Sequence, residues 1–190
     1  MTSNDTYASW ATKVYDWTTS VKLIDSNYNV FDGADAPDCT DTNTHQWSYN
    51  LATYLYGAAV MQSYTGGNST WVDNTNGLLN ATSYFFVPPE YSNANIMYEP
   101  DCEFAHSCNS DQLSFKSYLA LALAVTSVLA PSTAGKITPL LQASAQGAGA
   151  ACSGRDNACG TLWYIDGTDN TSGLGQQLCA MDVMLSLLAW

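Results

Sequence analysis

Apolar residues recur every three or four positions over several stretches of the chain, and polar segments rich in Gly, Pro, Asn and Cys separate these stretches. In the first stretch, Tyr7, Trp10, Val14 and Trp17 follow this spacing, which predicts a helix. The predicted helices cover residues 6–22, 44–65, 69–85, 109–130, 133–150 and 174–190, and short extended segments are predicted at 29–31 and 162–165.

The predicted helix 44–65 has an unusual composition. It contains no Asp, Glu, Lys or Arg, and it carries Trp47, Tyr49 and Asn50 near its start. An ordinary surface helix has one apolar stripe and one charged face. Large aromatics on more than one face of an uncharged helix indicate contacts on several sides.

The predicted helix 109–130 is almost entirely apolar after Lys116, which predicts burial on both of its sides. Asn109 and Gln112 have the spacing of a capping box at its start. Its uninterrupted apolar part, residues 118–130, is shorter than the roughly 18–20 residues of a membrane span. We therefore expect a buried helix of a globular domain.

Long and short connections alternate along the chain. Long loops precede the predicted helices at 44, 109 and 174, whereas tight turns precede those at 69 and 133. This alternation predicts an all-α fold of about three helical hairpins with the long loops at one end. Hairpins stacked around an axis form an α/α toroid, and three are too few to close it. We expect residues 1–190 to form one partial domain with a cleft lined by the loops.

Charged residues make up only 12% of the chain, and the net charge is −12. This acidic balance argues against nucleic acids and anionic membranes as partners. Asn, Ser, Thr and Tyr supply the polarity instead, as in many secreted proteins. Four Asn-X-Ser/Thr sequons fit that interpretation, at Asn4, Asn68, Asn80 and Asn170.

Six cysteines also indicate an oxidising compartment. Two close pairs in polar loops predict local disulfides, which are Cys102 with Cys108 and Cys152 with Cys159. A distant partner for Cys39 is left open, and Cys179 lies in an apolar helix that favours a buried free thiol. No signal peptide follows Met1, so a secreted protein would require a longer chain than this one.

Other chemistries receive little support. His106 between Cys102 and Cys108 could suggest zinc, but a fourth ligand is missing and a disulfide is favoured. No G-x-S-x-G motif is present. The acidic loop with Asp32, Asp35, Asp38 and Asp41 lacks the EF-hand pattern, so turn formation is expected for these residues, although Asp32 or Asp35 at the edge of a cleft is left open. Asp101 and Glu103 are expected to be exposed. We expect no metal and no cofactor.

Three segments resemble glycoside hydrolase family 76, and specifically its fungal GPI-anchored mannan endo-1,6-α-mannosidases. They are the long run from YNVFDGADAPDC through WSYN to YTGG and beyond, the run IMYEPDCEFAHSCNSDQLSFKSYLA, and the closing GLGQQLCAMDVMLSLL. The resemblance covers essentially the whole chain and corresponds to the C-terminal half of the family domain.

The resemblance implies an (α/α)6 barrel that cleaves or transfers α-1,6-mannosides at one end, with α-1,6-linked mannan or the mannose of a GPI glycan as partner. It implies an extracellular, cell-wall or plasma-membrane location. The family uses two consecutive aspartates, as suits retaining chemistry with carboxyl groups about 5 Å apart. This chain contains no Asp-Asp pair and no GPI-signal tail, so we expect no catalytic residue in it and no activity from it alone.

The substrate-binding candidates are five residues near the loop ends of the predicted helices. Aromatic planes stack on the apolar faces of sugars, and amides pair with hydroxyls in both directions. Core packing is the competing interpretation for the aromatic candidates and for Asn50, and reaching solvent is the competing interpretation for the lysine. Gln176, or its neighbour Gln177, could instead serve only the helix N-terminus. The candidates are Trp47, Tyr49, Asn50, Lys116 and Gln176.

Two alternatives to an enzyme part are left open. One is a non-catalytic mannan-binding module on the same half-fold. The other is a half-barrel that requires the missing N-terminal half, or self-association, because half a barrel leaves an apolar face exposed.

Overall fold

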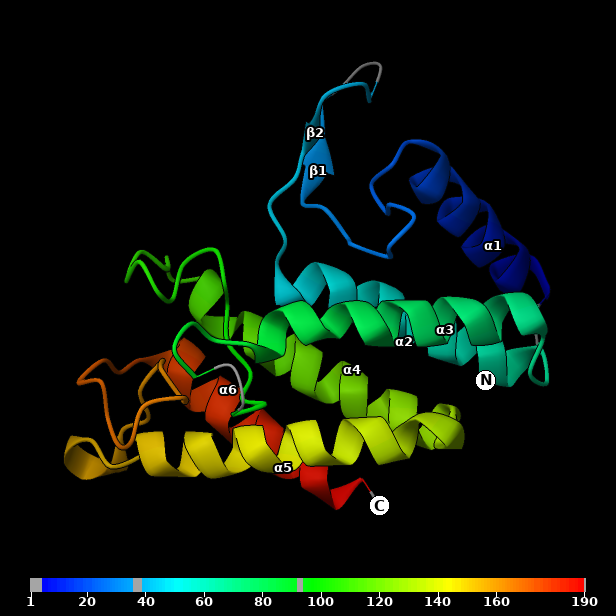
Figure 1. The fold of residues 1–190 in the computed structure, drawn as a ribbon. Coiled ribbons are helices and arrows are strands. Elements are labelled where there is room, and N and C mark those ends of the chain that lie inside the picture. Colours follow the sequence, from blue (N-terminus) through cyan, green and yellow to red (C-terminus); the bar gives the residue numbers. More distant parts are fainter. Residues whose placement is uncertain (1–4, 36–38, 92–93, 190) are drawn as a thin grey trace.

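The computed structural model describes residues 5–35, 39–91 and 94–189, and it is all-α apart from one short β-hairpin (Figure 1). The α-helices of the described residues are α1 (Asp5–Ser20), α2 (Ser48–Tyr64), α3 (Ser69–Ala81), α4 (Phe115–Leu129), α5 (Ala134–Ala151) and α6 (Leu174–Leu185). Short 3-10 turns follow or precede several of them, at Thr82–Phe86, Gln112–Ser114, Pro131–Thr133, Arg155–Asn157 and Ser186–Leu188.

The helices run back and forth between two ends of the molecule. Helices α2, α4 and α6 start at the end where the long loops gather, and α3 and α5 return to it, so that α2–α3 and α4–α5 form antiparallel hairpins (Figure 1). This arrangement confirms the predicted incomplete α/α toroid with its long loops at one end. We call this end the loop end.

Helix boundaries follow local signals in the sequence. Gly66 and Gly67 end α2 with positive φ angles of 65° and 86°, a conformation that glycine adopts at little cost. The predicted capping box is present, since the Asn109 side chain accepts from the Gln112 N–H and the Gln112 side chain accepts from the Asn109 N–H. However, it caps the 3-10 turn Gln112–Ser114, and α4 begins only at Phe115.

The two predicted extended segments are wrong in detail. Near residues 29–31 only Val30 forms a bridge, with Ile24, and the hairpin instead pairs β1 (Gly33–Ala34) with β2 (Thr42–Asn43). Residues 162–165 form a turn that lies directly against α5. A Cβ atom at Gly147 of α5 would come within 2.4 Å of the Trp163 carbonyl oxygen, so the close contact requires glycine there.

The core lies between α2 and α4 and extends to the helices around them. Leu51 and Leu55 of α2 and Leu119 and Leu123 of α4 are at most 1% exposed. Helix α3 contributes Trp71, Leu78 and Leu79 to the core, and Phe85 lies just beyond the helix. Burial of this apolar surface is the main driving force for folding.

The continuous helical segment Gln112–Leu129 is long and apolar enough to cross a membrane, judged by length and composition alone. This segment is longer than the apolar part expected from the sequence, because the 3-10 turn Gln112–Ser114 is continuous with α4. Half of it is buried inside the structure, where it packs against α2, α5 and α6. Burial of this kind is the behaviour of a core helix.

Several helices nevertheless leave apolar side chains uncovered. On α4 these follow one stripe, at Tyr118, Leu121, Val125 and Val128, and the Leu121 side chain is 44% exposed. The side chains whose spacing predicted α1 also face outward. All four are exposed, namely Tyr7, Trp10, Val14 and Trp17. On α6 the uncovered side chains are Met181, Met184 and Leu185. We call these residues together the exposed helix faces.

Candidate functional site

Aromatic side chains from the starts of α2 and α4 form a cluster at the loop end. The Trp47 ring lies 5.8 Å from the Phe115 ring in an edge-on arrangement, and the Tyr49 ring lies 4.4 Å from Phe115. Tyr118 approaches Tyr49 from the next turn of α4, and the His45 ring stacks on Trp47. We call these five residues the aromatic cluster.

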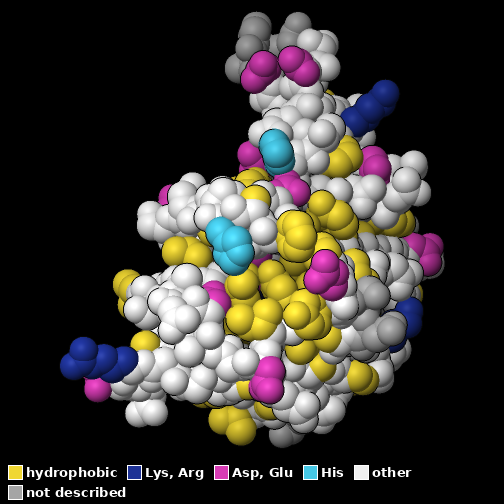
Figure 2. Space-filling model, turned by 60° about the vertical axis from the view of Figure 1, so that its left-hand side comes forward, with side chains coloured by type: hydrophobic (Ala, Val, Ile, Leu, Met, Phe, Trp, Pro, Cys, Tyr) yellow, Lys and Arg dark blue, Asp and Glu magenta, His cyan; other side chains and the backbone are white. Residues whose placement is uncertain are grey.

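The cluster is partly open to solvent. Trp47, Tyr49 and Phe115 are half-buried, whereas Tyr118 and His45 are exposed. Figure 2 shows the loop end, where hydrophobic side chains gather in the middle of the face and both histidines lie around them. Tyr49 is therefore available for contact and not sealed in the core.

Asn50 lies beside the cluster and is half-buried. Its amide nitrogen donates a 3.3 Å hydrogen bond to one oxygen of Asp32, and Asn43 donates to the other oxygen. Asp32 is exposed and so links the base of the β-hairpin to α2. Asp35 and Asp41 lie farther along the hairpin, where the Asp35 N–H bonds the Asp41 carbonyl, and Asp38 lies outside the described residues.

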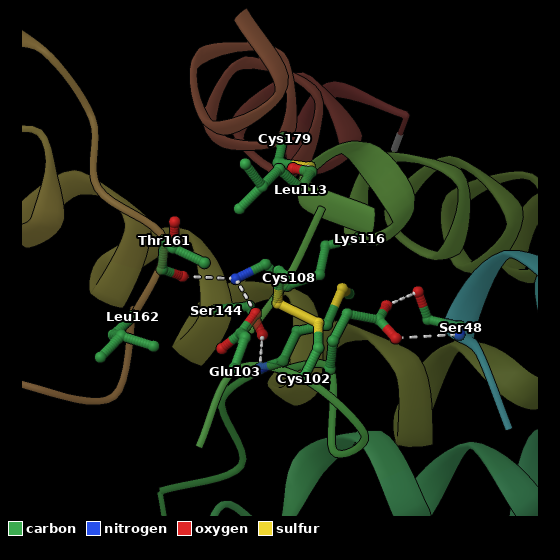
Figure 3. Close-up of polar contacts among 12 residues, drawn as sticks. Ser48, Cys102, Glu103, Cys108, Leu113, Lys116, Ser144, Thr161, Leu162 and Cys179 are labelled. Carbon is green, nitrogen blue, oxygen red and sulfur yellow. Dashed lines mark hydrogen bonds and ion pairs between the residues drawn. A yellow bond between two sulfur atoms is a disulfide. The ribbon is translucent and has the colours of Figure 1, made fainter. Parts of the chain in front are cut away.

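Two acidic residues of loop 87–111 fix the segment that leads into α2. Asp101 accepts hydrogen bonds from the His45 ring at 2.8 Å and from the Gln46 N–H at 3.2 Å. Glu99 accepts from the Ser48 N–H at 3.2 Å and also contacts the Ser48 hydroxyl (Figure 3). A carboxyl group therefore takes the place of the missing side-chain cap at Trp47 and holds the residues that carry the aromatic cluster.

Glu99 is only 1% exposed, and burial raises its pKa to about 8, against the opposing effect of the Ser48 hydrogen bond. Nearby Glu103 raises this pKa further and Lys116 lowers it. At neutral pH, the protonated form of Glu99 therefore predominates. A neutral acid can donate to the Ser48 hydroxyl while accepting from the Ser48 N–H.

Lys116 lies in the interior, so the expectation that it reaches solvent is wrong, and its role in substrate binding stays a prediction. The side chain is 3% exposed, its Nζ forms a 2.7 Å ion pair with Glu103 and donates at 2.6 Å to the Thr161 carbonyl (Figure 3). It also lies 3.9 Å from the centre of the Trp163 ring. A lysine usually keeps its ammonium group in water, but here the buried carboxylate of Glu103 takes the place of water.

Glu103 was expected to be exposed and is instead 2% exposed. Burial raises its pKa, and the adjacent Lys116 opposes this rise. Asp101 is half-buried against His45 and Tyr84, which also differs from the expectation. The sequence gives one signal for Glu103, because an apolar helix with a single lysine requires a counter-charge from elsewhere.

Gln176 is buried at the start of α6 and lines a small cavity at the loop end. Its neighbour Gln177 is exposed and accepts from the Cys159 N–H at 3.3 Å. The two glutamines therefore differ in their surroundings. Gln177 accepts a hydrogen bond from the backbone, whereas Gln176 lines the cavity.

Both close cysteine pairs form disulfides, Cys102–Cys108 and Cys152–Cys159. Cys39 and Cys179 are free, and the Cys179 thiol is buried and directed at the Leu113 carbonyl. Within the described part of the chain, no three His, Cys, Asp or Glu side chains come together as a metal site would require.

The sequon asparagines Asn68, Asn80 and Asn170 are all exposed. Asn68 also caps α3 by accepting from the Thr70 N–H, and Asn80 accepts from the Lys136 ammonium group of α5. Asn4 lies outside the described residues. Attachment of sugar to these side chains stays a prediction.

Sequence reasoning missed Phe115, Tyr118 and His45 as members of the cluster. Phe115 and Tyr118 are three residues apart at the start of α4, so they share one face of that helix. The signal that was available is that this helix, like α2, begins with aromatic residues after a long loop.

Comparisons with known proteins give a consistent result. The profile of glycosyl hydrolase family 76 matches residues 1–190. A Schizosaccharomyces pombe protein is 44% identical over 195 residues, covering 99% of this chain and 43% of the relative. The mannan endo-1,6-alpha-mannosidase DCW1 of Saccharomyces cerevisiae is 39% identical, covering 99% of this chain and 41% of the relative. The chain thus spans less than half the length of these relatives.

Solved structures agree with the fold. Dfg5 from Chaetomium thermophilum, in complex with glucosamine, superposes with a TM-score of 0.89 at 35% identity and covers 98% of this chain and 46% of that one. An α-1,6-mannanase of Salegentibacter, in complex with α-1,6-mannotriose, has a TM-score of 0.76 at 19% identity, which supports the fold alone; this match covers 98% of this chain and 54% of that one. On the evidence of the profile match over its whole length, the chain belongs to glycosyl hydrolase family 76.

Proposed function

We propose that this chain forms one wall of the mannan-binding cleft of a fungal mannan endo-1,6-alpha-mannosidase. The observation that carries the proposal is the half-open aromatic cluster at the loop end, with Asn50 beside it. Aromatic rings stack on the C–H faces of a sugar, and an amide can donate to and accept from its hydroxyls. The names of the relatives supply the substrate class, α-1,6-linked mannan or the mannose of a GPI glycan.

The reaction would be hydrolysis or transfer at an α-1,6-mannoside bond. Both need a pair of carboxyl groups about 5 Å apart in a retaining site. The chain has no Asp-Asp pair, and its buried acids Glu99 and Glu103 already bond Ser48 and Lys116. We infer that the chain binds glycan but does not cleave it alone, and that another segment supplies the reacting acids.

The exposed helix faces support the proposal that a partner of matching shape covers them. An apolar groove of about 230 Å³ lies between α2 and α4 and includes Tyr56, Leu121 and Val125, and another of about 370 Å³ lies between α1 and α2. Thr53 of α2 lines both grooves, so they adjoin. Exposed apolar surface of this kind marks an interaction site. The other half of an α/α barrel is the partner that we propose, with a second copy of this chain as the alternative.

The location that we propose is the cell surface or wall. Two disulfides favour an oxidising compartment, and three exposed sequon asparagines are accessible for glycosylation. Low charge combined with many Asn, Ser and Thr residues suits a glycosylated secreted protein.

Calorimetric titration with α-1,6-mannotriose tests the binding role. Tyr49→Ala is expected to weaken binding by about 1–2 kcal/mol, because a ring that stacks on the sugar is lost. Tyr56→Ala is the matched control, since Tyr56 is an exposed tyrosine on the same helix outside the cluster. Equal affinities for wild type and Tyr49→Ala would remove the support for a sugar-binding cluster.

A non-catalytic mannan-binding module is the second candidate. The absence of an Asp-Asp pair favours it. Under this alternative, the sugar titrations give the same affinities as under the proposed function. The chain, however, shows no turnover of mannan even when it is joined to the part of a relative that it does not match.

A further inference from the structure

A cavity of about 140 Å³ lies at the loop end between the Cys102–Cys108 loop, the turn before α4 and the start of α6. It is separate from the residues of the aromatic cluster. The residues that line it are Glu103, His106, Cys108, Leu113, Thr161, Leu162, Asp169, Thr171 and Gln176.

The walls of this cavity are held in place by bonds of their own. Asp169 accepts hydrogen bonds from the backbone N–H groups of Thr161, Leu162 and Thr171, at 3.0–3.1 Å. Burial opposes its ionisation, but these bonds and one from the Thr171 hydroxyl outweigh that effect and lower its pKa. A Cβ atom at Gly160 would lie 2.3 Å from the carboxylate, so glycine is needed for this approach. Cys108 of the Cys102–Cys108 disulfide also lines the cavity.

Two buried polar side chains on the cavity are available to a ligand. The Gln176 side chain is 5% exposed and lines the cavity. Glu103 is 2% exposed, and while its Oε1 pairs with Lys116, its Oε2 has no partner in the described chain. Unpaired buried polar atoms are costly, and they are uncommon in native proteins. Their position on a preformed cavity points to a ligand that completes them.

We propose that this cavity is a subsite for a single hexose unit of a neutral glycan, whose hydroxyls pair with Oε2 of Glu103 and with the amide of Gln176. The assignment rests on the proposed function, because it takes the glycan class from there. The cavity is about tenfold larger than the roughly 10–15 Å³ that one water needs. It is smaller than the roughly 300 Å³ of sites for drug-sized ligands, so it accommodates one sugar ring and not a chain.

A cation is the less suitable ligand. Lys116 already compensates the charge of Glu103 at 2.7 Å, and Asp169 is saturated by backbone donors. The groups that remain are Oε2 of Glu103 and the amide of Gln176. This mixture of donors and acceptors matches the hydroxyl edge of a sugar.

The cavity and the aromatic cluster lie close together along the chain. Leu113 lines the cavity, and Phe115, two residues later, belongs to the cluster. Both therefore flank the start of α4. One glycan could place successive sugar units on the aromatic cluster and in the polar subsite.

The test is a titration of the 190-residue chain with methyl α-D-mannopyranoside, followed by amide NMR shifts. We expect saturable shifts at Thr161, Thr171 and the Gln176 side chain. Gln176→Leu should weaken binding by about fivefold or more, as expected for lost hydrogen bonds. Its unfolding midpoint should not fall. Gln142→Leu, at an exposed position of α5, is the matched control and should bind as wild type does. Unchanged affinity of Gln176→Leu, or no shifts at these residues, would overturn the subsite.

A parallel titration with α-1,6-mannotriose separates this proposal from the proposed function. If Tyr49→Ala weakens trisaccharide binding while Gln176→Leu has no effect on either sugar, the subsite fails and the aromatic cluster stands. If Gln176→Leu weakens binding of the monosaccharide while Tyr49→Ala leaves trisaccharide binding intact, the subsite stands and the role of the cluster fails.

Discussion

Two regions of the molecule reverse the usual distribution of polarity. Beneath the loop end, Glu99, Glu103 and Lys116 are each at most 3% exposed, so charged or ionisable groups lie inside. Along the exposed helix faces, large apolar side chains such as Trp10 and Leu121 lie outside. An independent globular domain shows the opposite pattern on average. The difference fits the proposals that the loop end carries the functional site and that another segment covers the exposed helix faces.

The largest effect is expected from breaking the buried ion pair. Lys116→Met leaves Glu103 without its counter-charge, and loss of one partner of a buried pair costs about 3–5 kcal/mol. Urea unfolding measures this loss. The double variant Lys116→Met with Glu103→Leu should recover most of the stability, because no buried charge remains. A loss below about 1 kcal/mol for Lys116→Met, the range of surface pairs, would contradict the interior position of this lysine.

Two leucines on α4 sharpen the contrast between inside and outside. Leu123 is fully buried and Leu121 is 44% exposed. In the isolated chain, Leu123→Ala should cost about 2–5 kcal/mol in the free energy of unfolding. Leu121→Ala should stay within about 0.5 kcal/mol.

The same pair of substitutions then reports on the partner. In a longer protein that covers the exposed helix faces, Leu121→Ala should become as costly as Leu123→Ala, since both side chains would be buried. A cost for Leu121→Ala that does not change in the longer protein would mean that this face remains open to solvent there.

The last effect is a pH dependence that originates at Glu99. Burial raises the pKa of this group from 4.5 to about 8, so the folded chain binds the proton more tightly than the unfolded chain. Its stabilising contribution is complete below about pH 4.5 and is lost as the pH rises through about 8. The decline should amount to about 1 kcal/mol per pH unit.

Glu99→Gln removes this titration while keeping a donor and an acceptor for Ser48. Urea unfolding at several pH values between 4.5 and 8 should therefore show a flatter dependence for the variant. Equal slopes for the wild type and the variant over this range would show that Glu99 does not bind its proton more tightly in the folded chain.

Much of the fold could be predicted from the sequence, because helix positions depend on local spacing and on local stop signals. The glycines at the end of α2 and the capping box at Asn109 are examples. The start of α4 was misplaced because a 3-10 turn and an α-helix share the same capping signal. The predicted strand near Val30 failed because the hairpin depends on pairing between Ala34 and Thr42.

The candidate site was predictable only in part. Trp47, Tyr49 and Asn50 do lie at the loop end, as the helix pattern indicated. Glu103 and Lys116 are 13 residues apart in sequence and belong to different elements, so no local spacing could reveal their ion pair. Such buried contacts depend on how the loops fold back over the helices, which the periodicity of one segment does not encode.

Turnover of α-1,6-mannan tests the central claim most directly. The measurement compares this chain alone with a chimera in which it replaces the matched region of DCW1 from Saccharomyces cerevisiae, so that the rest of that relative covers the exposed helix faces. The claim predicts binding without product release by the chain alone, and reducing-end or transfer product from the chimera. Product release by the chain alone at the chimera's rate would contradict it.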